Sequence, residues 1–198
     1  MGLFDSILGR SKPKQPRLDA LFSLPNAALT LEVAAGFRST GIGSVCYRGA
    51  EGAPFEQIQA QLTQLLSGAS PERVNDSYGW TWLVLRRDPS DVAGLVTELH
   101  AVNSTLEDEG FGPQLLCSLI GFADEAGRRL ALVYLYKRGT FYPFAPVPGA
   151  DQKRDNALEL QIRAVVGADL PIEAEVTRWF PVWGAPGLDA PPALPPTP

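Results

Sequence analysis

Few side chains in this 198-residue chain could do chemistry, and their spacing does not assemble a catalytic set. A serine or cysteine nucleophile needs a histidine close by to take its proton. The only histidine, His100, falls between apolar positions of a segment with helical periodicity. A helical histidine that is hydrogen-bonded within the fold or exposed to solvent is therefore a better interpretation than a catalytic base. We expect no catalytic residue and predict that the protein is not an enzyme.

The sequence also lacks the usual motifs of metal-binding and nucleotide-binding sites. Cys46 and Cys117 lie 71 positions apart, and no CxxC or HExxH pair occurs, although zinc sites usually carry such spacings. Gly41-Ile42-Gly43 lacks the third glycine of a dinucleotide-binding loop, and the chain contains no phosphate-binding loop of the Walker type. We expect no cofactor and no metal, and reduced buried thiols in place of a disulfide or redox pair.

One polar group could share a helical face. His100, Asn103, Ser104 and Glu107 recur at steps of three and four residues, which places them on a common stripe of an α-helix. A solvated helix face is the first interpretation of this stripe, contact with a partner the second and catalysis the third. The acidic run 107–109 is consecutive, so its carboxylates point in different directions and cannot work as a paired acid and base.

The elements that would position these side chains form an α+β pattern. Apolar and aromatic runs predict strands over residues 28–36, 40–48, 77–87, 114–122 and 130–135, followed by an aromatic hairpin that turns at 137–139. Helical periodicity predicts helices over 54–66, 90–109 and 155–166. Asp91 or Ser90 should cap the long helix and Gly110 should end it.

This order of elements predicts an α+β two-layer sandwich, with helices packed on one face of a mainly antiparallel sheet. The other face of the sheet then needs a cover. The segment 178–183, RWFPVW, is expected to close over it as a lid, and a second protomer is the alternative. A homo-oligomer is thus left open.

The chain divides into three expected parts: a basic amphipathic arm over residues 1–17, a single α+β domain over 18–184 and a disordered proline-rich tail over 185–198. Arg10, Lys12, Lys14 and Arg17 against Asp5 give the arm a net charge of +3. Because the whole chain carries −5, the remainder carries −8. An acidic body has no basic face to meet phosphates, so we expect no nucleic-acid partner.

The arm has the pattern of a small amphipathic helix, with large apolar residues at helical spacing followed by basic ones. A helix this short is marginal in water and should form only against a membrane or a protein surface. Docking on the membrane or a partner, docking on its own domain, and disorder are the three alternatives. The candidate contact residues for an anionic membrane or an acidic partner are Leu3, Phe4, Ile7, Leu8, Arg10, Lys12 and Lys14.

No run of eighteen apolar residues predicts a membrane-spanning helix, and the first nine residues fall short of a signal peptide. We therefore expect a cytoplasmic protein, with peripheral attachment at the inner face of the cell membrane if the arm binds lipid.

Several long segments, in order, resemble one family. They are SKPKQPRLDALFSLPNAALTLE, DSYGWTWLVLRRDPSDVAGLVTELHAVNSTLEDEGFGPQLLCSL, RRLALVYLYKRGTFYPFAP, DNALELQIRAVV and RWFPVWGAPGL. They are similar to the PspA-associated protein PspAB family of actinobacteria and some archaea, over most of residues 1–188. The resemblance implies a place in the PspA envelope-stress (phage-shock) response, with a PspA-type coiled-coil protein as partner and an HtpX-type membrane protease as a further one. It brings no assigned catalytic or binding residue with it.

The leading hypothesis from the sequence is a non-enzymatic adaptor of this stress response. It would bind PspA or a companion protein while residues 1–17 hold it near the membrane. The alternative is a small-molecule sensor or enzyme, because the aromatic residues of 78–82 and 134–144 could line an apolar pocket if the sheet face is not fully covered.

Overall fold

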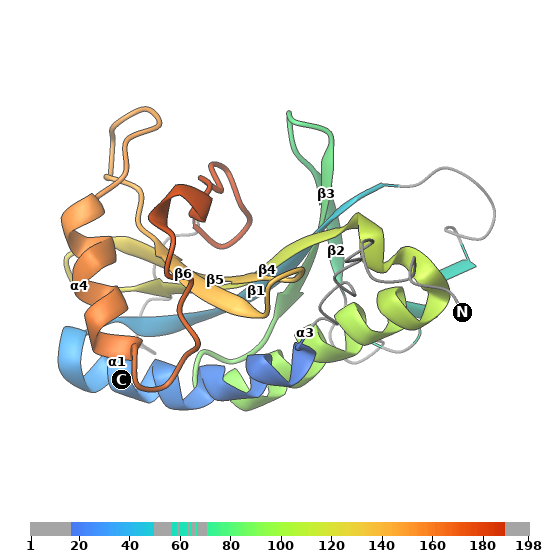
Figure 1. Ribbon diagram of the computed structural model, residues 1–198, viewed down its shortest axis with the longest axis horizontal. Helices are drawn as coiled ribbons and strands as arrows, with labels where there is room; N and C mark the ends of the chain where they lie inside the picture. The colour runs from blue at the N-terminus through green and yellow to red at the C-terminus, as the bar shows by residue number, and fades with distance from the viewer. Residues whose placement is uncertain are drawn as a thin grey trace, which may run out of the picture.

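The fold is built on one six-stranded antiparallel sheet (Figure 1). The computed structural model describes residues 17–49, 57–58, 60–62, 64, 66 and 71–188. The strands lie in the order β2-β3-β1-β4-β5-β6. Their bounds are β1 (Arg38–Arg48), β2 (Glu72–Asn75), β3 (Trp80–Arg86), β4 (Leu115–Ala123), β5 (Arg129–Leu135) and β6 (Thr140–Phe144). The predicted α+β sandwich with a mainly antiparallel sheet is confirmed.

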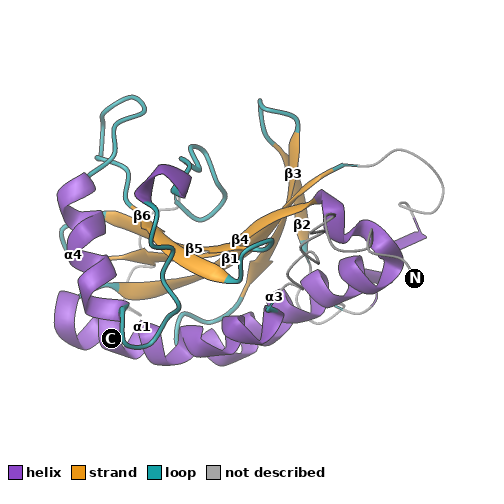
Figure 2. Ribbon diagram, in the orientation of Figure 1, coloured by secondary structure: helices purple, strands orange, loops and turns teal. Residues whose placement is uncertain are grey.

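The α-helices gather on one side of this sheet, whereas the short turn η4 lies on the other (Figure 2). The α-helices described over their whole length are α1 (Leu24–Ala35), α3 (Val92–Leu106) and α4 (Asn156–Val166). Shorter helical turns are η1 (Leu18–Ser23), η2 (Glu107–Phe111), η3 (Gly112–Gln114) and η4 (Val176–Arg178). Residues 57, 58, 60–62 and 64 are also α-helical and residue 66 lies in a turn, so the helix predicted over 54–66 is present but ends before residue 66.

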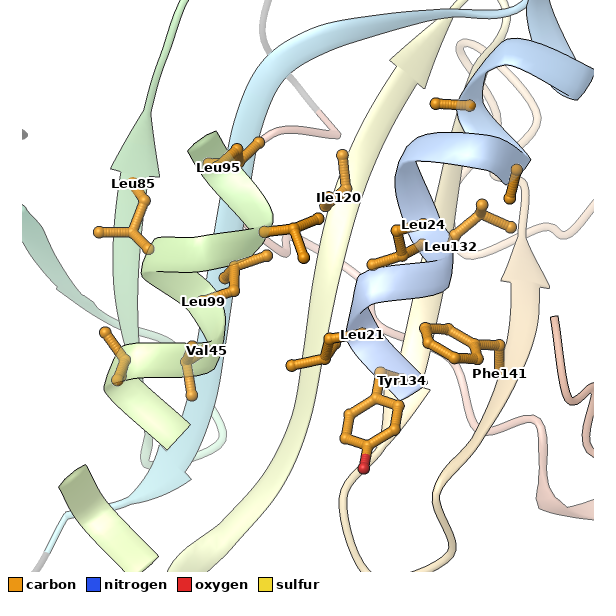
Figure 3. Packing of buried hydrophobic residues seen from close by; sticks show 14 of the residues in the cluster. Leu21, Leu24, Val45, Leu85, Leu95, Leu99, Ile120, Leu132, Tyr134 and Phe141 are labelled. Carbon is orange, nitrogen blue, oxygen red and sulfur yellow. The ribbon is translucent and has the colours of Figure 1, made fainter. Parts of the chain in front are cut away.

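The main core fills the space between these helices and the sheet. Leu95 and Leu99 of α3 lie near Leu85 of β3 and Val45 of β1, whereas Leu21 of η1 and Leu24 of α1 lie near Leu132 and Tyr134 of β5 (Figure 3). All four leucines are almost completely buried. Because burying a leucine contributes about 2 kcal/mol, these contacts fix the helices on the sheet.

The ends of α3 follow the sequence signals. The Asp91 carboxylate caps the helix by accepting a hydrogen bond from the Gly94 N–H at 2.9 Å. At the other end, α3 passes into the η2 turn, where Gly110 has a φ of 83°. A left-handed residue of this kind is what lets the chain leave a helix. The predicted cap and stop are both confirmed.

The second face of the sheet is covered by the C-terminal segment 176–188, which we call the cover segment (Figure 1). Its side chains form a second apolar cluster with those of the strands. The Trp179 ring stacks on Tyr142 at 6.0 Å between centroids, and Trp183 meets Phe144 edge-on at 4.8 Å. The predicted lid at 178–183 therefore packs on the sheet. It continues past the boundary expected at 184, since Leu188 is buried as well.

The strand predicted over 28–36 is wrong, because residues 28–35 belong to α1 and Gly36 caps its end. Leu24, Ala27, Ala28 and Leu31 are its buried residues, at helical spacing. Pro25 lies in the first turn, where a proline is well tolerated. The chain leaves α1 at its C-cap, Gly36, and Arg38 begins β1.

Two further differences concern the region of β2 and β3. Strand β2 was not predicted from the sequence. The strand predicted over 77–87 begins only at Trp80, so Tyr78 lies in the turn before β3 and is exposed. Trp82 faces the second core, and its indole N–H donates to Asp76 at 2.9 Å.

Candidate functional site

The polar stripe predicted on α3 does not form one site. The described structure divides its four residues among three environments: the core beneath the sheet, the contact with η1 and the start of η2. The reason is that a helix covered on two sides turns neighbouring positions toward different elements. Each part can be judged by its own contacts.

His100 lies between α3 and η1. Its ring packs on Phe22 at 4.7 Å between centroids, and its Nδ1 is 3.3 Å from the Ser104 hydroxyl. Its Nε2 lies 3.7 Å from the Asp19 carboxylate, whose side chain is almost fully exposed. This histidine joins α3 to η1. The described residues place no serine or cysteine nucleophile in contact with it other than the Ser104 hydroxyl, one turn along the same helix.

Asn103 points into the core and ties α3 to the sheet. Its side-chain N–H groups donate to the Leu99 carbonyl at 2.7 Å and to the Ser118 hydroxyl of β4 at 2.8 Å. Its Oδ1 is buried and accepts no hydrogen bond in the described structure; the Tyr134 hydroxyl is buried without a partner too. Strand pairing places Tyr134 directly opposite Ser118. These are structural contacts within the core.

Glu107 lies at the end of α3 beside the hydroxyl of Tyr136. Burial, followed by the nearby Glu107 carboxylate and the hydrogen bond between the two side chains, raises the pKa of Tyr136 to about 12. Tyr136 therefore stays protonated at neutral pH and cannot serve as a base. The pair holds the start of η2 against the end of β5.

The two cysteines lie next to each other in space. Cys46 of β1 and Cys117 of β4 are paired across the sheet and face the second core, where both are buried and free. The expectation of buried thiols is confirmed. The hydrogen bond to Cys117 and then burial raise the pKa of the Cys46 thiol far above its usual range. A thiol of this kind is a poor nucleophile, because the thiolate is the reactive form.

The aromatic surfaces of the sensor or enzyme hypothesis do not face a common space. Tyr134 and Phe141 lie in the core beneath the sheet, whereas Tyr142 and Phe144 lie under the cover segment. All four side chains have no exposed area, so this hairpin is filled core. Among the aromatic residues of 78–82 and 134–144, Tyr78 has the most exposed side chain, at 62%.

Buried carboxylates fix the cover segment to the body. Glu173 accepts hydrogen bonds from the Arg138 guanidinium, from the Thr140 hydroxyl at 3.0 Å and from the Glu175 N–H at 3.1 Å. Burial alone would raise its pKa, but these hydrogen bonds and the Arg138 charge lower it below the ordinary value. Arg154 joins Glu159 of α4 to the main-chain carbonyl of Trp179.

The strongest candidate for a contact surface is on α1. Six large apolar side chains of the described residues are exposed: Phe22, Leu29, Val33, Tyr78, Leu160 and Val176. The first three of these lie on the outer side of η1 and α1, four and seven residues apart, and are 50%, 64% and 89% exposed. Residues at this spacing share one face of a helix. We call them the α1 stripe.

The residues predicted to contact a membrane or partner, Leu3, Phe4, Ile7, Leu8, Arg10, Lys12 and Lys14, lie outside the described residues. Within the described chain, no helix combines the length and apolar character that crossing a membrane would require. The described residues also contain no group of three or more histidine, cysteine, aspartate or glutamate side chains that could hold a metal ion.

Fold and site together define an α+β protein whose sheet is packed on both faces and which exposes Phe22, Leu29 and Val33 along η1 and α1. Comparison with known families identifies the chain more narrowly. It belongs to the family described as PspA associated protein B, whose model matches residues 1–187. The resemblance noted in the sequence is thereby confirmed. No curated protein and no solved structure matches the chain.

Proposed function

We propose that this protein is a non-enzymatic adaptor of the PspA-dependent envelope stress response, which binds PspA or a companion protein at the inner surface of the cell membrane. The family match over residues 1–187 carries this proposal, because the family is described by its association with PspA. The HtpX-type protease remains a further candidate partner that rests on the family resemblance alone.

The contacts of the described residues favour a binding role over catalysis. His100 is engaged by Phe22 and Ser104, and the thiols of Cys46 and Cys117 are buried under the cover segment. Exposed apolar side chains on a rigid helix, by contrast, are typical of protein contact surfaces. The α1 stripe is the surface of this kind that we assign to the adaptor.

In this proposal the arm, residues 1–17, brings the adaptor to the membrane. Each basic residue near an anionic leaflet contributes about 1 kcal/mol, and the arm carries four of them beside the apolar residues 3, 4, 7 and 8. Together they provide weak and reversible attachment. The acidic body, with its charge of −8 in residues 18–198, is repelled by the same leaflet. The arm should thus lie between the body and the membrane.

The proposal is tested by affinity purification of a chromosomally tagged copy after mild crosslinking, with mass spectrometry of the co-purified proteins. Enrichment of a PspA-type protein over an untagged strain is the expected result. A form lacking residues 1–17 should retain PspA if the body binds it, and lose the membrane fraction. Reproducible purification without PspA, in cells that express it, would overturn the adaptor function.

The membrane part has its own measurement, sedimentation with vesicles of mixed anionic and zwitterionic lipid. Leu3→Asp combined with Phe4→Asp should abolish pelleting, and Val176→Asp, which changes an exposed apolar residue of the body, should leave it unchanged. Equal pelleting of all forms would remove membrane attachment by the arm.

A further inference from the structure

Cys46 and Cys117 lie where a disulfide could join them. The two residues are direct partners in the antiparallel pairing of β1 with β4, and both side chains belong to the apolar cluster under the cover segment. The Cα atoms of such partners are about 4.5–5.5 Å apart, which falls within the range of about 4.4–6.8 Å found in disulfides. The thiols are also hydrogen-bonded to each other. Joining the two sulfur atoms therefore needs no rearrangement of the strands.

The closed fold protects this pair from solvent. Strands β1 and β4 are the two central strands of the sheet, and Cys46 is also the direct partner of Trp82 on β3. The side chains of both cysteines are almost completely buried. Cys46 stays protonated because its pKa is raised, and a protonated thiol reacts slowly with oxidants. The thiols must therefore meet water before they can react at a useful rate.

Tyr142 connects the pair to the cover segment. Burial first, and then the neighbouring Cys117, raise the pKa of Tyr142 well above its ordinary value, so the phenol lies close to the thiols. The same phenol donates a hydrogen bond to the Phe180 carbonyl at 2.8 Å, and its ring stacks on Trp179. Because Trp179 and Phe180 belong to the cover segment, a transient opening of that segment exposes the face on which the sulfur atoms lie.

We propose that Cys46 and Cys117 are a redox-modifiable site, which forms an intramolecular disulfide with hydrogen peroxide when the cover segment opens transiently. One thiolate attacks the O–O bond of the peroxide and gives a sulfenic acid and water. The second thiolate attacks that sulfur, the hydroxyl group leaves as water, and the S–S bond forms. The two sulfur atoms lose two electrons in all. These electrons reduce the peroxide, and the thiol protons leave in the two water molecules.

This inference goes beyond the proposed function and does not rest on it, because it involves neither PspA nor a membrane. The reduced form is the resting form, in agreement with the two buried free thiols. The disulfide closes a loop between positions 71 residues apart and ties the two central strands together. A crosslink of this kind restricts the unfolded chain, so the oxidised protein should unfold at a higher urea concentration than the reduced one.

The test treats the reduced, full-length protein with hydrogen peroxide under native conditions that fully oxidise the urea-unfolded chain. The expected product in non-reducing peptide mapping by mass spectrometry is a peptide pair joined through Cys46 and Cys117, which dithiothreitol separates again. Persistence of both free thiols, or their separate oxidation to sulfinic or sulfonic acid, overturns the inference. Cys46→Ser is the control, because joined peptides from this variant would mean that the S–S bonds form between molecules.

A second measurement distinguishes opening of the cover segment from unfolding of the whole domain. Trp179→Ala removes the ring that stacks on Tyr142, whereas Leu99→Ala weakens the main core on the other face of the sheet. Reaction through a local opening follows the population of the open form, so Trp179→Ala should speed disulfide formation about tenfold or more. Leu99→Ala should leave the rate within about twofold of the wild type.

Equal acceleration by the two variants would show that the thiols react only from the unfolded chain, and would overturn the part assigned to the cover segment. Val182→Ala is a smaller truncation in the same segment, where Val182 is buried in the cluster with the thiols. It makes the same comparison with Leu99→Ala if Trp179→Ala does not fold. An unchanged rate for the folded cover-segment variant would overturn the gating as well.

Discussion

Asn103 shows how much one buried polar side chain can contribute to this fold. It joins the Leu99 carbonyl of its own helix to the Ser118 hydroxyl of β4. Asn103→Ala leaves both groups buried without this donor and opens a small cavity. Losing a partner of a buried polar group costs about 1–3 kcal/mol, so we expect the free energy of unfolding, measured in urea, to fall by about 2 kcal/mol.

The matched control for Asn103 is Thr97→Ala on the same helix. The Thr97 hydroxyl donates to the Ala93 carbonyl, but the side chain is exposed, so water can replace the bond. Its effect should stay within about 0.5 kcal/mol. Equal losses for the two variants would mean that the bond between Asn103 and Ser118 does not stabilise the fold.

Glu173 makes a pH-dependent contribution at the same scale. Its pKa is lowered in the folded protein by the hydrogen bonds from Arg138, Thr140 and Glu175. A depressed carboxyl pKa stabilises the fold above the unfolded value, near 4.5, and this stabilisation is lost as the pH falls through the lower folded value. Glu173→Gln should therefore reduce the unfolding free energy at pH 7. The difference from the wild type should become smaller as the pH falls below about 4.5.

The comparison for Glu173 is Glu72→Gln. Glu72 forms an ion pair with Arg86 in which both side chains are more than half exposed, and such pairs contribute about 0–1 kcal/mol. Chemical denaturation at several pH values gives the difference between each variant and the wild type. A pH-independent loss for Glu173→Gln would contradict the role of its ionised form.

At the scale of elements, α1 shows where the sequence misleads. Leu29, Leu31 and Val33 alternate with polar or small residues as they would in a strand. The same segment also has Pro25 near its start and Gly36 just after its end, which are helix boundary signals. These signals decide the structure, because Leu24, Ala27, Ala28 and Leu31 form a buried helical face. Of the other long periodic segments, α3 was predicted with its cap, and α4 (Asn156–Val166) with bounds within one residue of the predicted 155–166.

The candidate surface could not be predicted for the same reason. Because residues 28–36 were interpreted as a strand, the helical face that carries Leu29 and Val33 was not recognised, and both side chains are exposed on α1. The inward position of Asn103, by contrast, can be predicted from the sequence. It lies four residues after Leu99 and three before Leu106, both of which are buried, so the period of the helix places all three on the same face.

Strand β1 depends on a glycine that has no room for a side chain. Gly41 has a φ of 72° and lies in the irregular stretch of the pairing between β1 and β4. A Cβ there would be 2.2 Å from the main-chain carbonyl oxygen of Arg87. Because main chain must move to relieve this contact, we expect Gly41→Ala to lower the unfolding free energy by about 3 kcal/mol, measured by thermal or urea denaturation.

Gly127 separates the two effects at Gly41. It has a φ of 79° in the turn between β4 and β5, but a Cβ there would meet nothing within 4 Å. Gly127→Ala therefore adds only the conformational strain, about 1 kcal/mol. Similar losses for Gly41→Ala and Gly127→Ala would show that the contact with Arg87 is relieved without cost.

At the scale of the whole molecule, the protein uses its own chain to bury both faces of one sheet. Helices cover one face and the cover segment covers the other (Figure 1). The second protomer considered from the sequence is therefore not needed as a cover for the strands. What is left exposed is the outer side of the helix layer, where the α1 stripe lies. This division makes the outer side of the helix layer, rather than the faces of the sheet, the place where a partner could be bound.

The cover segment should behave as part of the core and not as a removable lid. Trp179 is buried against Tyr142, and its indole N–H donates to the Glu173 carbonyl at 3.0 Å. Removing a buried tryptophan side chain costs about 3–5 kcal/mol. Trp179→Ala should lower the unfolding free energy by this amount and raise the binding of a hydrophobic dye. Val176→Ala, three residues earlier and half exposed, should change neither. A Trp179→Ala protein as stable as the wild type would mean that the second face of the sheet tolerates exposure, and that the cover segment can open.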